Sequence, residues 1–300
     1  CTLMAGQAVA QEEVIEEVTI IGIRGSLQQA LDQKRNTSGV MDAISSEDIG
    51  KFPDANLAES LQRVTGVSIN RVEGEGSEVT IRGFSGDFNL VTLNGRQMPS
   101  ADARSIFFGI NSNTRSGDSR SFDFSNLASE GVSGLQVYKT GRASAASGGI
   151  GGTINVQTVR PLDLGGGTQF AVAAKAVQDD GASGATPEVN GLVSWANDDS
   201  TFGVTAFASY QEREFTNRTA LHGGIVWQIP YNPAIPAFAN AEVINPPDPD
   251  QLAGFPASST LVYSENTRER TNAALTMQWA PSDRLSITGD AMFAQNDQES

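Results

Sequence analysis

Apolar residues in the N-terminal part of the chain recur at helical spacing. Residues 26–34 predict a short helix with Leu31 on its apolar face. A second helix is predicted over residues 53–66, because Leu57 and Leu61 lie one above the other, a proline occupies the first helical position and a glycine follows the last. Each helix therefore has one face to bury.

Beyond the second helix the period of the pattern changes to two, which is the period of strands. Around Ile81 apolar residues alternate with polar ones, and the apolar run 90–93 leads into Asn94-Gly95, a strong hairpin signal. Further strands are predicted at residues 135–139 and at the end of the glycine-rich stretch 148–156. Together these segments predict a small mixed α+β unit.

After a Gly-Gly-Gly run near residue 165 the chain consists of alternating segments. Residues 202–210, 272–279 and 285–293 place apolar side chains on one face and polar side chains on the other. This alternation is typical of transmembrane barrel strands, although a soluble β-sandwich alternates in the same way. The period alone leaves both architectures open.

The connections between these segments distinguish the two architectures. Trp195 and Trp279 are each followed by a short turn, whereas the connections 179–187 and 218–258 are long. Short turns on one side, next to interfacial tryptophans, and long loops on the other side are the arrangement of outer-membrane barrels. We count about five strands by residue 300, too few to close a transmembrane barrel, so we expect further barrel strands beyond this residue.

Composition and charge limit the function classes. The 20 Lys and Arg residues and 35 Asp and Glu residues give a net charge of −15, which disfavours nucleic acid as a partner. With one histidine and one cysteine in the chain, triad and zinc chemistry lack their components, and paired carboxylates are the enzymatic possibility that stays open. We predict no enzyme activity, no cofactor and no metal site.

Two segments near the N-terminus carry signals of their own. Residues 1–10 end in Ala-x-Ala before an acidic stretch, as a signal peptide does at its cleavage site; an ordinary apolar segment and lipidation of Cys1 are the alternatives. Residues 17–22 form a short strand-prone run that fits either strand addition to another protein or an ordinary internal strand.

Several of these motifs occur together in an order that resembles the TonB-dependent receptors of Gram-negative outer membranes. The resemblance rests on the segments Glu17 to Gly22, Asn56 to Val67, Thr80 to Phe84, Val91 to Gly95, Val132 to Lys139 and Gly148 to Val156. It covers about half of the chain. Many members have Arg-Gly-Pro where this chain has Thr140-Gly141-Arg142, so any role of that arginine is not transferred.

The resemblance implies a mixed α+β plug domain followed by the first strands of an antiparallel transmembrane β-barrel. It divides the chain into a signal-peptide remnant (1–10), a TonB-box segment (11–25), a plug (26–164) and a partial barrel (165–300). The implied partners are the lipid bilayer, a small-molecule or oligosaccharide substrate, and the periplasmic TonB protein. TonB would pair as a strand with Glu17, Val18, Thr19, Ile20, Ile21 and Gly22.

The implied function is TonB-dependent active transport across the outer membrane, with an oligosaccharide as the expected substrate. A ferric-siderophore or cobalamin receptor, and a passive pore or surface-binding protein, are the alternatives. A signalling transducer would have a folded domain before the box, where this chain has only residues 11–16. The expected substrate contacts lie on plug loops and in the long outer connection: Arg71, Phe84, Phe88, Arg96, Trp227 and Tyr231.

Overall fold

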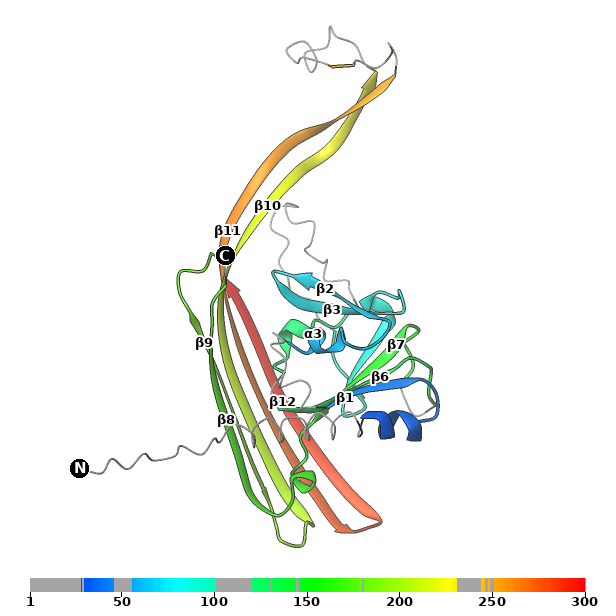
Figure 1. Ribbon diagram of the computed structural model, residues 1–300, viewed down its shortest axis with the longest axis vertical. Helices are drawn as coiled ribbons and strands as arrows, with labels where there is room; N and C mark the ends of the chain where they lie inside the picture. Colours follow the sequence, from blue (N-terminus) through cyan, green and yellow to red (C-terminus); the bar gives the residue numbers. More distant parts are fainter. Residues whose placement is uncertain are drawn as a thin grey trace, which may run out of the picture.

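The computed structural model describes two packed bodies, a mixed α+β unit and an antiparallel wall of strands (Figure 1). It describes residues 28, 30–45, 56–100, 120–129, 131–143, 146–179, 181–230, 244–245, 248 and 251–299. Residues 1–10 and 17–22, and with them the expected signal peptide and TonB box, lie outside this range.

The α+β unit is built on a five-stranded sheet of order β1-β6-β7-β4-β5. β4 runs parallel to β7, and the other neighbours are antiparallel. One face of the sheet carries the buried core side chains and the other face is polar. The strands are β1 (Met41–Ser45), β4 (Asn89–Leu93), β5 (Arg96–Gln97), β6 (Val132–Tyr138) and β7 (Gly152–Thr158).

The apolar face of this sheet packs against one short helix and a hairpin. The helix is α3 (Leu57–Leu61), and the hairpin pairs β2 (Val67–Val72) with β3 (Glu75–Ile81). The core combines Leu57 and Leu61 from the helix with Ile81 from the hairpin, all fully buried, and with the inner side chains of the sheet. Burial of each such side chain contributes about 1.5–3 kcal/mol. The 3-10 turns η1 (Gly86–Phe88), η2 (Phe124–Asn126) and η3 (Pro161–Leu164) complete the unit.

The start of α3 is fixed by Asn56. The predicted first helical residue, Pro53, lies outside the described residues. The side-chain oxygen of Asn56 accepts hydrogen bonds from the amides of Ala58 at 3.0 Å and Glu59 at 3.4 Å. Its amide group donates to the carbonyl of Gly76 in β3 at 2.6 Å. Asn56 therefore satisfies backbone hydrogen-bonding groups of both the helix and the hairpin, which fixes the start of the helix at this position.

Two local predictions have different outcomes. The Asn94-Gly95 hairpin is confirmed, because both residues have positive φ (50° and 83°), as this turn type requires, and they join β4 to β5. Residues 30–36 are helical as predicted, but Leu31 is 57% exposed, so the expected apolar face of this helix is wrong.

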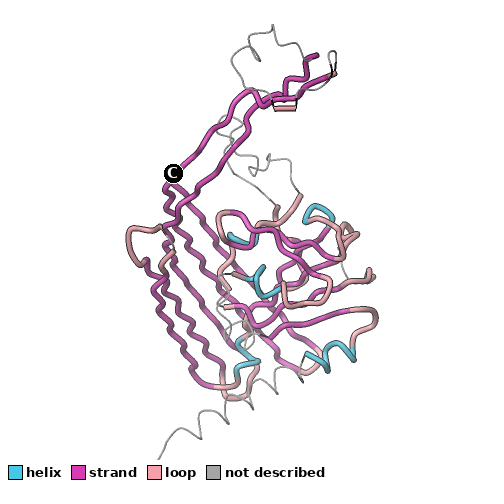
Figure 2. Tube along the Cα trace, turned by 45° about the horizontal axis from the view of Figure 1, so that its top comes forward, coloured by secondary structure: helices cyan, strands magenta, loops and turns pink. Residues whose placement is uncertain are grey.

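The strand wall is a meander of five antiparallel strands in the order β12-β11-β10-β9-β8 (Figure 2). Each strand pairs with its neighbour in sequence. Among the described residues no helix has the length and apolar character needed to cross a membrane. The strands are β8 (Gly167–Val177), β9 (Thr186–Ala196), β10 (Phe202–Pro230), β11 (Leu252–Ser282) and β12 (Leu285–Glu299).

The predicted alternation separates two faces of the wall. On β11, Leu275, Met277 and Trp279 are exposed, whereas their neighbours Thr276 and Gln278 are buried. The buried polar face is the one toward the α+β unit. An apolar outer face with a polar inner face is the arrangement of a lipid-facing barrel wall.

The long connection predicted over residues 218–258 is wrong for about half of its length, residues 218–230 and 252–258. β10 and β11 continue as a paired ribbon to Pro230 and from Leu252, so the two strands are 29 and 31 residues long. A membrane crossing takes about 9–11 strand residues. The β10–β11 ribbon therefore projects far beyond the other strands of the wall, as Figure 1 shows.

We expect Asn56→Ala to destabilise the α+β unit by about 2–4 kcal/mol, because the helix loses its cap and the buried carbonyl of Gly76 loses its donor. Calorimetry of the purified receptor should show a lower unfolding temperature. Asn70→Ala, at an exposed position of β2, is the control. Equal unfolding temperatures for the two variants would contradict the double role of Asn56.

The outer face of the wall can be tested with matched leucine replacements on β11. Leu275→Arg places a charge in the middle of the apolar face and should cost about 2–4 kcal/mol of membrane stability. Leu261→Arg changes an outward leucine of the ribbon, 84% exposed, and should cost little. The measurement is folding of the receptor into lipid vesicles. A smaller loss for Leu275→Arg than for Leu261→Arg would place the membrane elsewhere.

Candidate functional site

Phe84 and Phe88, two of the predicted contact residues, lie side by side. Their ring centroids are 6.3 Å apart in an edge-to-face arrangement, and the side chains are 42% and 48% exposed. The segment between them is fixed by Asn89, whose amide group donates to the carbonyls of Phe84 and Ser85. The α+β unit thus presents a rigid, exposed aromatic pair.

A glycine makes room for this aromatic pair. The amide of Gly151 donates to the carbonyl of Phe88 at 3.0 Å. A Cβ atom at position 151 would lie 2.7 Å from the Cβ of Phe84. The glycine-rich entry to β7 is therefore needed for close backbone approach beneath the two rings.

The other two predicted contacts of this unit lie elsewhere. The Arg71 guanidinium, on β2, contacts Glu59 at 3.3 Å and Gln62 at 3.2 Å, so part of its hydrogen-bonding capacity is used within the unit. Arg96 is an exposed residue of β5. Because Phe88 precedes β4 and Arg96 follows it, the length of that strand separates them. The structure therefore does not gather all four residues into one site.

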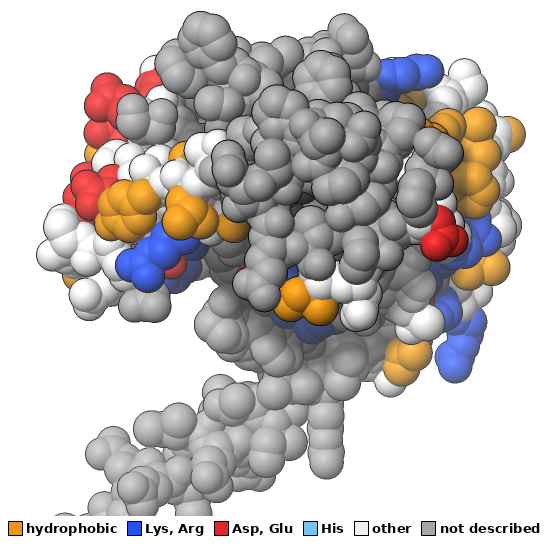
Figure 3. Space-filling model, turned by 90° about the horizontal axis from the view of Figure 1, so that it is seen from above, with side chains coloured by type: hydrophobic (Ala, Val, Ile, Leu, Met, Phe, Trp, Pro, Cys, Tyr) orange, Lys and Arg blue, Asp and Glu red, His pale blue; other side chains and the backbone are white. Residues whose placement is uncertain are grey.

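Viewed from above, hydrophobic side chains lie next to Lys and Arg along the edge on the side of the α+β unit (Figure 3). The exposed apolar residues of this unit include Phe84, Phe88 and Ile150. Trp227 belongs to strand β10 of the ribbon, opposite Phe255, and not to a loop as predicted. Tyr231 lies outside the described residues.

A charged cluster between the two bodies was not predicted. Glu75, on β3, is 1% exposed and lies between arginines of the wall. Its carboxylate is 2.9 Å from Arg213, 2.7 Å from Arg268 and 3.8 Å from Arg270. Arg213 also contacts Asp179, with one nitrogen–oxygen distance of 3.0 Å. We call these five residues the Glu75 cluster.

The sequence contained part of the signal for the Glu75 cluster. Arg268 and Arg270 stand two apart on β11, at the polar positions of the alternation, so both point to the inner face. Buried charges need partners, which predicts acidic groups opposite them. The identity of that partner depends on how the α+β unit docks, and no local pattern contains this information.

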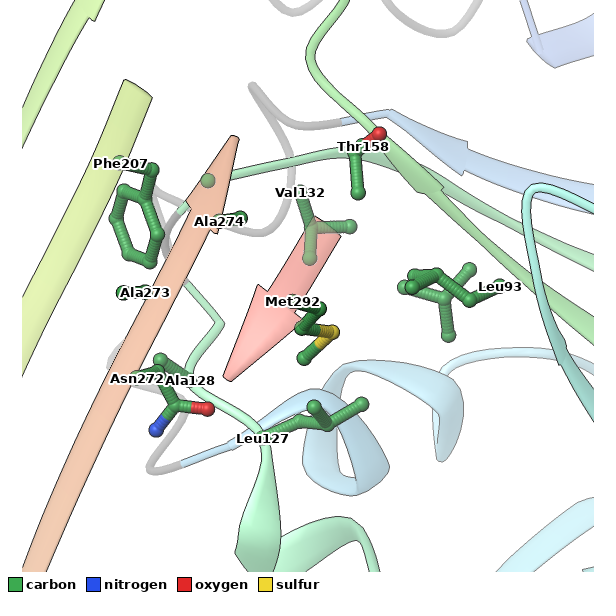
Figure 4. A pocket seen from close by; sticks show the side chains of 12 residues that line it. Leu93, Leu127, Ala128, Val132, Thr158, Phe207, Asn272, Ala273, Ala274 and Met292 are labelled. Atoms are coloured by element: carbon green, nitrogen blue, oxygen red, sulfur yellow. The ribbon is translucent and has the colours of Figure 1, made fainter. Parts of the chain in front are cut away.

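An apolar contact holds the two bodies together at another level of the wall (Figure 4). The ring of Phe207 lies against Gly131, where a Cβ atom would be 2.7 Å from the ring. The small cavity beside this contact has a volume of about 30 Å³ and is lined mainly by apolar side chains. This volume holds at most about one water molecule. The cavity is therefore a packing defect and not a ligand site.

Among the described residues no three His, Cys, Asp or Glu side chains come close enough together to hold a metal ion. The buried charges of the Glu75 cluster are engaged with one another. The arrangement of this region is that of an interface between two bodies, with exposed aromatic residues on one of them.

The sequence comparison agrees with the architecture. The sequence model of the family described as TonB-dependent Receptor Plug Domain matches residues 33–153. This range covers the five-stranded sheet, α3 and the β2–β3 hairpin up to the start of β7. No curated protein matches this sequence.

Solved structures show the same fold. The ferric enterobactin receptor PfeA of Pseudomonas aeruginosa, in complex with BCV-L6, aligns with a TM-score of 0.56 at 14% identity, over 87% of this chain and 34% of that chain. The copper transporter OprC gives a TM-score of 0.52 at 13% identity, over 87% and 31%. The outer membrane transporter YddB of Escherichia coli gives 0.51 at 14%, over 86% and 33%.

The chain spans about a third of the length of these transporters. Its α+β unit matches the plug family by sequence, and its wall has the lipid-facing alternation of an outer-membrane barrel. Residues 33–153 are therefore a plug domain of the TonB-dependent receptor family, and they are followed by strands with the fold of an outer-membrane barrel wall.

Proposed function

We propose that this receptor actively transports a scarce substrate across the outer membrane with energy supplied through TonB, and that it is not an enzyme. The observation that carries the proposal is the interface between plug and wall. Charged residues hold the plug at the Glu75 cluster, and a small apolar contact holds it at Phe207. Such a plug closes a passage and is released when these contacts break.

The energetics of the Glu75 cluster fit a closure that opens without unfolding. Breaking a buried ion pair is costly while it stays dry, but charged groups regain solvation once water enters. The apolar core of the plug has no such compensation. Force applied to the plug would therefore separate the plug from the wall, or detach polar elements of the plug, before it opens the core.

The energy input is proposed to enter at Glu17 to Gly22, by strand pairing with the periplasmic domain of TonB. This segment precedes helix 30–36, the first described element of the plug. Strand addition uses backbone donors and acceptors, so the pairing depends on the main chain of the segment more than on any one side chain.

For the substrate we propose an oligosaccharide, with the Phe84–Phe88 pair as the first contact on the plug and with Arg71, Arg96 and Trp227 as further candidates. Exposed aromatic faces suit sugar rings, because their C–H groups form an apolar surface. They also suit the aromatic groups of an iron chelate. Since PfeA is a ferric enterobactin receptor of the same fold, a ferric siderophore is the alternative substrate class.

Replacement of Ile20 by proline tests the energy input, because proline removes one backbone donor from the pairing strand. In cells that express the full-length receptor, uptake of one substrate class from a panel of oligosaccharides and ferric siderophores should fall at least tenfold, while surface binding is retained. Glu13→Pro, upstream of the segment, is the control. Unchanged uptake of every class would favour a passive pore or a surface-binding protein.

Glu75→Gln tests the closure. The variant keeps the shape of the side chain but removes the carboxylate that three wall arginines share, which weakens the interface by about 3–5 kcal/mol; Arg213 keeps its contact with Asp179. We expect more frequent ion-conducting openings of the full-length receptor in planar bilayers. Glu59→Gln, which removes a carboxylate that contacts Arg71 within the plug, is the control. If both variants conduct alike, the Glu75 cluster does not hold the plug closed.

A further inference from the structure

A row of polar side chains crosses the three central strands of the plug sheet, β6, β7 and β4. The register places Gln136 of β6 beside Asn155 of β7, and Asn155 beside Thr92 of β4. The opposite face of these strands carries core residues such as Val137 and Ile154. The polar row therefore lies on the face turned away from α3 and the hairpin.

These side chains are joined by hydrogen bonds into a chain. The Gly95 amide and the Thr92 hydroxyl donate to Asn155 Oδ1, at 2.8 Å and 2.9 Å. Asn155 Nδ2 donates to Gln136 Oε1 at 3.2 Å, and Gln136 Nε2 donates to Gln33 Oε1 at 3.3 Å. We call these five residues the amide ladder.

The direction of the bonds is the same along the ladder. From Gly95 through Asn155 and Gln136 to Gln33, every donor points toward helix 30–36. Aligned hydrogen bonds polarise one another, so the loss of one bond weakens the next. The ladder therefore connects two elements that are 62 residues apart in the sequence, since 95 minus 33 is 62.

One end of the ladder is a weakly held element. Helix 30–36 is joined to the sheet by Gln33 and by the ion pair between Lys34 and Asp42 at 2.6 Å, while Leu31 points to solvent. A groove of about 660 Å³ lies beside the helix, between Gln28, Asp32 and the sheet. Elements held by few buried apolar contacts open at low free-energy cost.

The carboxylate of Asp42 adds an electrostatic contact at the same end. Burial raises the pKa of Asp42, but hydrogen bonds from Lys139 and Lys34 lower it by more than burial raises it. The pKa of Asp42 therefore lies below its usual value. The carboxylate is therefore ionised near neutral pH, and Lys34 stays paired with it. The helix contacts the sheet through polar groups at both points.

The other end of the ladder is the β4–β5 turn. Asn94 adopts positive φ and is fixed to β7 by two hydrogen bonds with Thr158, at 2.9 Å and 3.0 Å. Gly95 is fixed by its bond to Asn155. Arg96, a proposed substrate contact, is the next residue. The conformation of this turn therefore depends on two residues of β7, Thr158 and the ladder residue Asn155.

We propose that the amide ladder couples helix 30–36 to the β4–β5 turn. Displacement of the helix removes the acceptor of Gln136, which loosens Asn155 and then Gly95. Coupling of this kind is reciprocal. A ligand that binds the turn therefore changes the docking equilibrium of the helix by the same factor by which helix docking changes the affinity for that ligand. Its use in transport rests on the proposed function, because TonB would pull on the segment before this helix.

The coupling is measurable without substrate or TonB, because the Gly95 amide is itself a member of the ladder. Hydrogen exchange of the full-length receptor in detergent, resolved to the peptide that contains Gly95, reads out the far end. The variants are Gln33→Leu, Gln136→Leu and the double variant. Gln157→Leu is the control, since Gln157 lies on the same face of β7, two residues from Asn155, outside the ladder.

We expect each single ladder variant to speed exchange at Gly95 by roughly fivefold, the equivalent of one lost hydrogen bond. The double variant should be no faster than Gln136→Leu alone, and Gln157→Leu should match the wild type. Unchanged exchange at Gly95 in Gln33→Leu, or additive effects in the double variant, would overturn the coupling.

Two readouts separate the possible failures. If Gln136→Leu also speeds exchange in the core of β6 and β7, that variant destabilises the whole sheet. The coupling is then judged from Gln33→Leu alone, which changes a partly exposed helix residue. If Ile20→Pro leaves uptake unchanged while the exchange coupling is observed, the amide ladder is present but the proposed transport function is wrong.

Discussion

The structure depends on one constraint: charged and polar side chains on the inner face of the wall must find partners away from water. Arg268 and Arg270 point inward because β11 alternates, and the outer face of the same strand is apolar. Buried guanidinium groups without a carboxylate would be strongly unfavourable. Glu75 of the plug supplies that carboxylate, so wall and plug complete each other at this point.

The plug itself combines interactions of two kinds. Leu57, Leu61 and the inner face of the sheet form a dry core that water cannot stabilise once it is opened. The Glu75 cluster and the amide ladder consist of polar contacts that water can replace. The core therefore keeps its shape when these polar contacts break and form again.

The position of these polar contacts gives them a common use. The Glu75 cluster lies between β3 and the wall, and the amide ladder crosses the sheet between the first helix and the β4–β5 turn. The exposed Phe84–Phe88 pair is placed at the start of β4, the strand that ends in this turn. Strand β4 thus connects the aromatic pair to the element that the ladder controls.

The sequence by itself determined the local elements whose signals lie within a few residues. The Asn94-Gly95 turn needs positive φ at both positions, and the alternation on β11 follows from the two-residue period of strands. Both were predicted correctly, as were the fold class and the receptor family. Leu31 follows a helical pattern but is exposed, because its helix contacts the sheet through polar groups and not through an apolar face.

The tertiary structure decided what depends on distant partners. Asn56 caps α3 because it also reaches Gly76, and β10 and β11 extend far into residues 218–258 because each strand supplies the backbone partners of the other. The Glu75 cluster and the amide ladder join residues that are far apart in the chain. Local patterns describe which face of an element is polar, but only docking of one element on another determines which polar groups meet.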